Sequence, residues 1–210
     1  MTATAVGLVS VAGLVFAHFR ASRTGVIVFK VIAASCFVWA AIGWGALSGE
    51  YGRVLLAGLV LCWFGDVFLL SSGQSTGFKL GIAAFLLGHV AYGVAFAGLG
   101  INWAVSLAAV IVVAVIASKI HGWLAPHLSS SFAAPVRAYL AVISLMVVLA
   151  VGAAWETGAW LIAVGAVGFA ASDIAVARGR FVAAGFSNNA WGTPLYFASQ
   201  YVLAATVAVV

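Results

Sequence analysis

The two aspartates of this chain, Asp66 and Asp173, lie inside long apolar runs, LVLCWFGDVFLL and VGFAASDIAVA. A charged side chain near the centre of a transmembrane helix costs roughly 2.5 to 3.5 kcal/mol on insertion scales, so such residues usually face a polar interior and mark a functional site. Two carboxyls that share a cavity can divide acid–base work, because closely held like charges favour one protonated and one ionised group. The placement of both aspartates therefore predicts one shared functional site.

Other polar side chains lie in apolar runs at helical spacings. His89 and Tyr92 are about one turn apart, and Tyr196 and Gln200 are four residues apart, so each pair occupies one face of a helix. We expect both faces to look inward, with His89 either a hydrogen-bonded core residue or part of the site. For Asn188 and the asparagine after it, contact with a polar headgroup and a role in a turn are both open.

Several other kinds of chemistry lack their usual residue patterns. His89 and two aspartates are few ligands for a metal site, and the sequence has no HExxH motif and no cysteine cluster. It also has no Gly-x-Ser-x-Gly motif of a serine hydrolase. We therefore expect no metal and no cofactor, and acid–base catalysis by the two carboxyls is the enzymatic option that remains.

The composition decides the class of protein that must position these residues. Of 210 residues, 66% are hydrophobic and 6% are charged, and the mean hydropathy is +1.24. These values exclude a soluble globular domain and indicate a polytopic integral membrane protein. Because backbone polar groups inside a bilayer need partners within the protein, the expected fold class is all-α.

Charges and clusters of Gly, Pro, Ser and Asn divide the chain into eight apolar runs, each about long enough to cross a bilayer. The first run has no basic segment before it, so we expect a retained helix and not a cleaved signal peptide. We expect a single transmembrane domain over residues 1–210, in one helical bundle. The eight predicted spans lie near 3–19, 26–47, 54–71, 78–97, 103–118, 137–154, 159–177 and 193–210.

Lysine and arginine gather in alternate connections between these runs, and only Arg53 falls on the other side, with Glu50 and Glu156. Because Lys and Arg concentrate in cytoplasmic loops, the pattern predicts both termini outside, and the inner membrane as the location if the protein is bacterial. Topology accounts for the net charge of +5, so no nucleic-acid partner is expected. The predicted cytoplasmic group comprises Arg20, Arg23, Lys30, Lys79, Lys119, Arg137, Arg178 and Arg180.

The predicted topology places both aspartates at the same depth, four or five residues before the cytoplasmic ends of their helices. His89 follows Asp66 by 23 residues, and Tyr196 follows Asp173 by the same step. The shared step, with Asp173 four helices further along the chain than Asp66, suggests a parallel duplication about an axis along the membrane normal. The repeat halves would be residues 1–100 and 101–210.

The strings around these residues resemble those of the YhhN family of membrane proteins, which includes the animal lysoplasmalogenases. The chain departs from the family at Lys30, because Val31 follows it where the family often has Lys-Pro. The resemblance covers most of the predicted third to eighth helices. The matching strings are GDVFLL at 65–70, GxxxFLLGHVxY at 81–92, PVxxY at 135–139 with Met146 after it, Ser172 with Asp173, and LYFASQ at 195–200.

The resemblance implies hydrolysis of the vinyl-ether bond of a lysoplasmalogen, a lysophospholipid, with both aspartates essential and no redox cofactor. A protonated carboxyl would protonate carbon while the other carboxylate stabilises the oxocarbenium ion and activates water, as in glycoside hydrolysis. The polar residues named above, together with Tyr139, are expected to position water and the ether oxygen. The phosphate is expected to meet Lys79, Arg137 or Arg178.

Two alternatives from other classes stay open. A small transporter or proton-coupled carrier would use the intramembrane carboxyls to bind a cation or protons. The polar residues gather toward one membrane face and do not line a full path, which argues against a carrier. A structural or receptor-like bundle in contact with membrane lipids would leave both aspartates without a role. No motif indicates the oligomeric state.

Overall fold

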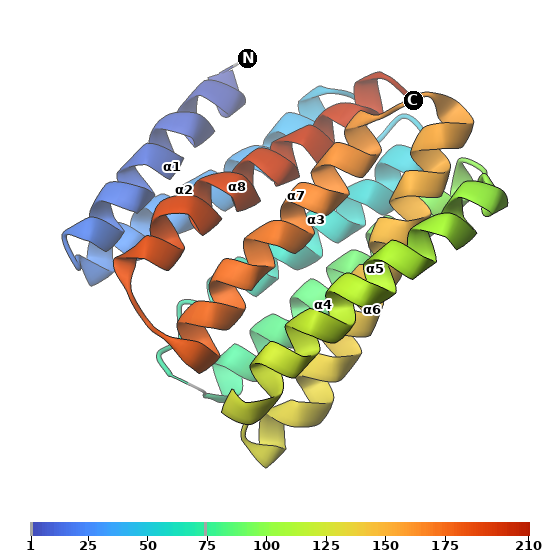
Figure 1. Cartoon of the computed structure of the whole chain (residues 1–210). Coiled ribbons are helices and arrows are strands. Elements are labelled where there is room, and N and C mark those ends of the chain that lie inside the picture. Colours follow the sequence, from blue (N-terminus) through green and yellow to red (C-terminus); the bar gives the residue numbers. More distant parts are fainter. Residues whose placement is uncertain (1, 74) are drawn as a thin grey trace.

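Eight long helices form one bundle in the computed structural model, which describes residues 2–73 and 75–210 (Figure 1). No β-strand occurs in these two ranges, so the predicted all-α class is confirmed. The long helices are α1 (Thr2–Phe19), α2 (Arg23–Gly43), α3 (Glu50–Phe68), α4 (Thr76–Gly98), α5 (Trp103–Leu124), α6 (Ser130–Thr157), α7 (Leu161–Ala177) and α8 (Phe186–Ala205). Shorter helical turns are η1 (Ala125–His127), η2 (Arg178–Val182), which is π-helical, and η3 (Thr206–Ala208).

The largest differences from the predicted spans are at α6 and α8, which each begin seven residues early, because proline and asparagine suggested breaks that the chain does not make. α6 begins before Pro135 and α8 begins before Pro194. Proline inside a helix removes one backbone hydrogen bond, but tertiary packing often overrides such local preferences. Asn188, predicted to lie in a loop, therefore lies in the first turn of α8.

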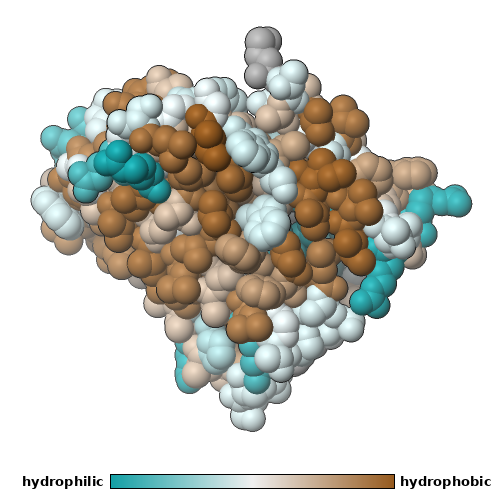
Figure 2. Space-filling model, turned by 180° about the vertical axis from the view of Figure 1, so that it is seen from behind, coloured by the Kyte–Doolittle hydropathy of each residue, from teal (hydrophilic) through white to brown (hydrophobic). Residues whose placement is uncertain are grey.

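The outer surface of the bundle is apolar. Seven of the eight long helices in the described part of the chain are long and apolar enough to cross a membrane. α8 is the exception because it carries polar residues such as Asn188, Thr193 and Gln200. It packs against α1, α2, α3 and α7. Large side chains such as Ile111 and Val115 on α5 are exposed, and Figure 2 shows an apolar surface across the middle of one face, with hydrophilic residues near its edges. These features identify an integral membrane protein.

The helices alternate in direction, so the connections that follow α1, α3, α5 and α7 share one end of the bundle. We call it the basic end because Arg20, Arg23, Arg178 and Arg180 lie in or beside those connections. The start of α1 and the C-terminus lie at the opposite end (Figure 1). The charge distribution favours a cytoplasmic basic end, and this orientation stays a prediction.

Glycines let the helices that carry the aspartates approach their neighbours closely. A Cβ atom on Gly88 of α4 would lie 2.8 Å from Cys62 Sγ and 3.2 Å from the Gly58 carbonyl oxygen of α3. A Cβ atom on Gly165 of α7 would lie 2.7 Å from the side chain of Leu203 in α8. Small residues at such contacts are typical of membrane helix pairs. The pairs α3–α4 and α7–α8 therefore hold their backbones at short separations.

The helix contacts of the two halves correspond. α3 packs on α2 as α7 packs on α6, and α4 packs on α6 as α8 packs on α2. This arrangement is what the predicted parallel repeat would produce, and the duplication itself stays a prediction.

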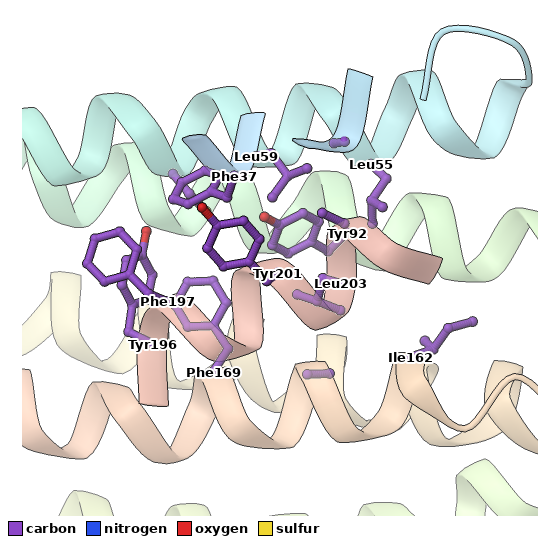
Figure 3. Packing of buried hydrophobic residues seen from close by; sticks show 14 of the residues in the cluster. Phe37, Leu55, Leu59, Tyr92, Ile162, Phe169, Tyr196, Phe197, Tyr201 and Leu203 are labelled. Carbon is purple, nitrogen blue, oxygen red and sulfur yellow. The ribbon is translucent and has the colours of Figure 1, made fainter. Parts of the chain in front are cut away.

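An aromatic cluster fills the centre of the bundle and supports α8. The ring centroid of Tyr196 lies 5.3 Å from that of Phe169 on α7 and 4.8 Å from that of Phe197. Figure 3 shows these three rings together, beside Phe37 of α2. Because the three phenylalanine rings are buried and each packs against the Tyr196 ring, they restrict the position of the Tyr196 hydroxyl.

Candidate active site

Asp66 lies in the last turn of α3 and is only 2% exposed. Its Oδ1 atom lies 3.2 Å from Lys30 Nζ of α2, and its Oδ2 atom accepts a 2.6 Å hydrogen bond from the hydroxyl of Tyr196 in α8. Three helices therefore meet at this carboxyl. A buried carboxylate needs a countercharge and hydrogen-bond donors, and Lys30 and Tyr196 supply both.

Asp173 lies on α7, four residues before the last residue of that helix. Its Oδ2 atom accepts a 2.6 Å hydrogen bond from the hydroxyl of Tyr139 in α6 and lies 4.0 Å from His89 Nε2 of α4. The ion pairs of the described chain give it no lysine or arginine partner, in contrast to Asp66. The two aspartates therefore have different surroundings.

His89 is buried between α4 and α7 and uses one ring nitrogen to bind its own helix. Nδ1 lies 2.6 Å from the carbonyl oxygen of Phe85, which can only accept, so Nδ1 carries the proton of that hydrogen bond. Nε2 is buried and has no hydrogen-bond partner among the described residues. Asp173 is the acidic residue that this nitrogen faces.

A chain of hydrogen bonds connects the remaining predicted residues to Asp66. The Tyr92 hydroxyl donates to Gln200 Oε1 at 2.7 Å, and Gln200 Nε2 donates to the Tyr196 hydroxyl at 3.1 Å. Tyr196 then donates to Asp66. Tyr92 and Gln200 therefore contact the site through Tyr196 and orient its hydroxyl. Neither residue lines the cavity that contains the two carboxyls.

One cavity of about 620 Å³ connects the two carboxyl groups to the basic end of the bundle. Asp66, Asp173, Tyr139 and Tyr196 line it. Behind the cavity lining, the Phe169 ring packs against both sides of the site, since its centroid lies 4.5 Å from that of His89 and 5.3 Å from that of Tyr196. A substrate in this cavity would meet both carboxyls.

The two sides of the cavity differ in polarity. The side formed by α1, α2 and their connection carries His18, Ser22, Arg23 and Lys30 among its lining residues. The side formed by α5 and α6 is apolar except for the Tyr139 hydroxyl. Its apolar lining residues are Ile120, Leu124, Val136, Leu140 and Ile143.

Three basic residues predicted to meet a phosphate are not among the residues that line the cavity. Arg178 donates a 2.7 Å hydrogen bond to Asn188 Oδ1. The Lys79 ammonium lies 5.2 Å from the ring centroid of Phe132, and Arg137 is exposed. Asn188 does line the cavity, but its amide nitrogen is also used, because it donates to the Ala183 carbonyl at 2.8 Å.

Arg180, in the π-helical turn after α7, lines the cavity and was not predicted as a site residue. Its guanidinium donates to the carbonyl oxygens of Leu69 at 2.8 Å and Gly73 at 3.1 Å, and it lies 4.7 Å from the ring centroid of Phe78. Arg180 therefore ties the end of α7 to the connection after α3. This contact links the chain segments that follow the two aspartates.

Lys30 is the second site residue that sequence reasoning missed. It was placed with the loop charges, yet it lies seven residues inside α2, within an apolar run. A lysine at that depth in a membrane helix is itself a signal that a partner acid lies nearby. Only the tertiary structure identifies that partner as Asp66.

Comparison with known proteins places the chain in a family. The family model described as the YhhN family matches residues 3–207. Two proteins named lysoplasmalogenase, from Mycobacterium bovis and Mycobacterium tuberculosis, are each 35% identical to this chain over 153 residues. The match covers 71% of this chain and 57% of each relative, so the chain spans little more than half the length of those relatives. No solved structure matches it. This chain belongs to the YhhN family.

Proposed function

We propose that this protein is a lysoplasmalogenase-type hydrolase. It would cleave the vinyl-ether bond of a lysoplasmalogen and release a fatty aldehyde and glycerophosphoethanolamine or glycerophosphocholine. The name of the mycobacterial relatives supports this activity. The structural observation that carries the proposal is the single cavity in which Asp66 and Asp173 are both lining residues.

The chemistry of a vinyl ether suits two carboxyl groups. Protonation of the carbon that is not bonded to oxygen produces an oxocarbenium ion, which water captures as a hemiacetal. The hemiacetal then collapses to an aldehyde and an alcohol. A protonated carboxyl supplies the proton, and a carboxylate stabilises the cation and takes a proton from water, as in glycoside hydrolysis. No cofactor enters this scheme.

The size and the lining of the cavity suit a lipid with one chain. A volume of about 620 Å³ lies within the range of roughly 300 to 1,000 Å³ that small-molecule sites occupy. Apolar side chains from α5 and α6 would contact the hydrocarbon chain. Arg23 and Arg180, which line the cavity at the basic end, would meet the phosphate in place of Lys79, Arg137 and Arg178. The site would therefore take a lysophospholipid from the surrounding membrane.

The test is aldehyde release from a lysoplasmalogen by detergent-purified protein, with the saturated ether-linked analogue as the substrate control. We expect release from the vinyl ether alone. Asp66→Asn and Asp173→Asn should each lower the turnover rate at least about 100-fold, the usual contribution of a positioned acid or base. Glu156→Gln, an exposed acid at the opposite end of the bundle, should keep the wild-type rate. Full turnover in both folded aspartate variants would refute the mechanism.

A carrier is the second candidate, and a specific observation favours it. The Lys30–Asp66 ion pair lies within the bundle, and the two halves have corresponding helix contacts, as in many transporters. A counterflow measurement in liposomes separates the two functions. Accumulation of a labelled substrate without aldehyde formation would support transport and exclude the hydrolase.

A further inference from the structure

The two aspartates differ in the number of hydrogen-bond donors that face them. Asp66 faces two donors, the Lys30 ammonium at 3.2 Å and the Tyr196 hydroxyl at 2.6 Å. An ionised carboxylate can only accept hydrogen bonds, so two donors, one of them charged, match the ionised form. The surroundings of Asp66 therefore fit a carboxylate.

Asp173 faces one donor and one acceptor. The Tyr139 hydroxyl donates to it, but His89 presents Nε2, whose ring already holds its proton on Nδ1 against the Phe85 carbonyl. A carboxylate oxygen and a nitrogen lone pair would face each other across 4.0 Å with no proton between them. A proton on the carboxyl of Asp173, directed at Nε2, removes the repulsion between these two acceptors, although 4.0 Å is longer than a hydrogen bond.

A doubly protonated His89 fits less well. It would place a full positive charge on a ring that is 1% exposed, and Asp173 at 4.0 Å is too distant to accept a hydrogen bond from Nε2–H. Burial of such a charge without a hydrogen bond is costly. Neutral His89 beside a protonated Asp173 therefore leaves no buried charge on this side of the site.

The polarity of the cavity gives an independent reason to distinguish the two acids. Asp173 receives its hydroxyl donor from α6, the helix that supplies Leu140 and Ile143 to the apolar side of the cavity. Asp66 receives its ammonium from α2, the helix that supplies Arg23 to the polar side. A lipid that matches this polarity places its chain near Asp173 and its glycerol near Asp66. The vinyl carbon that takes the proton belongs to the chain.

We propose that Asp173 is the proton donor of the reaction and that Asp66, positioned by Lys30, is the carboxylate that takes the proton of the attacking water. This inference rests on the proposed function and assigns the two roles within it. His89 is a positioning residue, because its unpaired Nε2 faces Asp173 and favours the protonated carboxyl over the carboxylate.

The proposed cycle is balanced. Asp173 gives its proton to the chain-side vinyl carbon, and the C=C electron pair forms the new C–H bond, which leaves an oxocarbenium ion and an Asp173 carboxylate. Water adds to the oxygen-bearing carbon while Asp66 takes one of its protons, which gives a hemiacetal. Asp66 then returns this proton to the departing glycerol oxygen as Asp173 takes the hemiacetal hydroxyl proton. Both carboxyls end in their starting states, and the sum is addition of one water across the cleaved bond.

The assignment predicts that the two Asp→Asn variants fail at different steps. Without Asp66, protonation at carbon still occurs, but capture by water is slow, so the oxocarbenium ion returns to substrate. In D₂O, Asp66→Asn should therefore exchange the chain-side vinyl hydrogen of recovered substrate for deuterium, with little aldehyde formed. Asp173→Asn should show neither exchange nor hydrolysis.

The experiment incubates purified full-length protein in D₂O with a 1-alkenyl lysophosphatidylethanolamine and follows deuterium in recovered substrate and in aldehyde by mass spectrometry. The ratio of exchange to hydrolysis is the readout, since it does not depend on the fraction of folded protein. We expect this ratio to rise at least tenfold in Asp66→Asn. Wild-type aldehyde should carry one deuterium on the carbon next to the carbonyl.

Two further variants keep the test independent of the aspartates themselves. Lys30→Gln removes the countercharge of Asp66 and should raise the ratio of exchange to hydrolysis, whereas Lys30→Arg, which keeps the charge, should restore it toward the wild-type value. Tyr139→Phe removes the donor to Asp173 and should slow exchange and hydrolysis together, with the ratio unchanged. A merely structural role for Lys30 would leave the ratio unchanged in every variant at that position.

Several results would overturn the assignment. Exchange in Asp173→Asn but not in Asp66→Asn would reverse the roles, and absence of exchange in both variants would show that both acids are needed for proton transfer. Aldehyde without deuterium would exclude protonation at carbon. No aldehyde from folded wild-type protein would instead refute the proposed function, on which the assignment rests.

Discussion

His89 and Tyr196 each lie 23 residues after one aspartate, and each faces the other aspartate. His89 follows Asp66 by 23 residues but lies 4.0 Å from Asp173, whereas Tyr196 follows Asp173 by 23 residues and donates to Asp66 at 2.6 Å. Each aspartate has one partner from its own half of the chain, Lys30 for Asp66 and Tyr139 for Asp173, and one from the other half. The two halves must therefore pack together before either aspartate has all of its neighbours.

The tyrosines of α8 allow a matched test of hydrogen bonding. Tyr196→Phe removes the donor to Asp66 and should cost about 1 to 3 kcal/mol of stability, because a buried polar group loses its partner. Tyr201→Phe removes a buried hydroxyl that has no partner in the described structure, so stability should stay the same or rise. Melting temperatures in detergent measure both effects. Equal losses in the two variants would contradict the hydrogen-bond account.

The Lys30–Asp66 pair should behave as a coupled unit. Lys30→Met leaves a buried carboxylate without its countercharge and should destabilise the protein by about 3 kcal/mol, near the lower end for buried pairs because Lys30 is 18% exposed. The double variant Lys30→Met with Asp66→Leu should regain most of that stability, although it loses activity. A double-mutant cycle on thermal stability measures the coupling, and additive losses would show that the pair does not interact.

Close packing of α3 and α4 should depend on Gly88. Gly88→Ala places a methyl group 2.8 Å from Cys62 Sγ, so α4 must move away from α3 and take His89 with it. We expect a loss of about 1 to 3 kcal/mol, typical of overpacking, and reduced turnover. Gly98→Ala on the same helix meets nothing within 4 Å and should leave both properties unchanged. Comparison of melting temperature and turnover for these two variants provides the measurement.

The polarity of the cavity predicts separate determinants of chain and headgroup preference. Ile143→Phe adds bulk to the apolar side and should lower turnover of long-chain substrates more than that of short-chain ones. Leu145 lies on the same helix but is exposed, so Leu145→Phe should change the turnover of neither long-chain nor short-chain substrates. Arg23→Gln should weaken the preference for phosphate-bearing lipid over 1-alkenylglycerol, with chain preference unchanged. Competition between paired substrates measures each preference. An effect of Ile143→Phe on headgroup preference and of Arg23→Gln on chain preference would reverse the proposed orientation of the lipid.

The sequence alone predicted the class of fold and most of the polar residues that gather around the two aspartates. Apolar runs of bilayer length predict helices because a backbone in lipid must satisfy its own hydrogen bonds, and eight helices form where eight were predicted. Asp66 and Asp173 are conspicuous for a similar physical reason, since a charge inside an apolar run is costly unless a partner compensates it. The helical spacings of Tyr92, Tyr196 and Gln200 likewise placed these residues in the interior, where the structure finds them.

The partners of each acid were decided only by the tertiary structure. Lys30 precedes Asp66 by 36 residues and Tyr196 follows it by 130, and no local spacing can indicate contacts between helices so far apart in the chain. Packing also left Lys79, Arg137 and Arg178 outside the cavity lining and brought Arg180 into it, where the connection after α3 accepts hydrogen bonds from its guanidinium. Sequence determines which groups are too costly to leave unpaired in a membrane, whereas helix packing determines which groups pair.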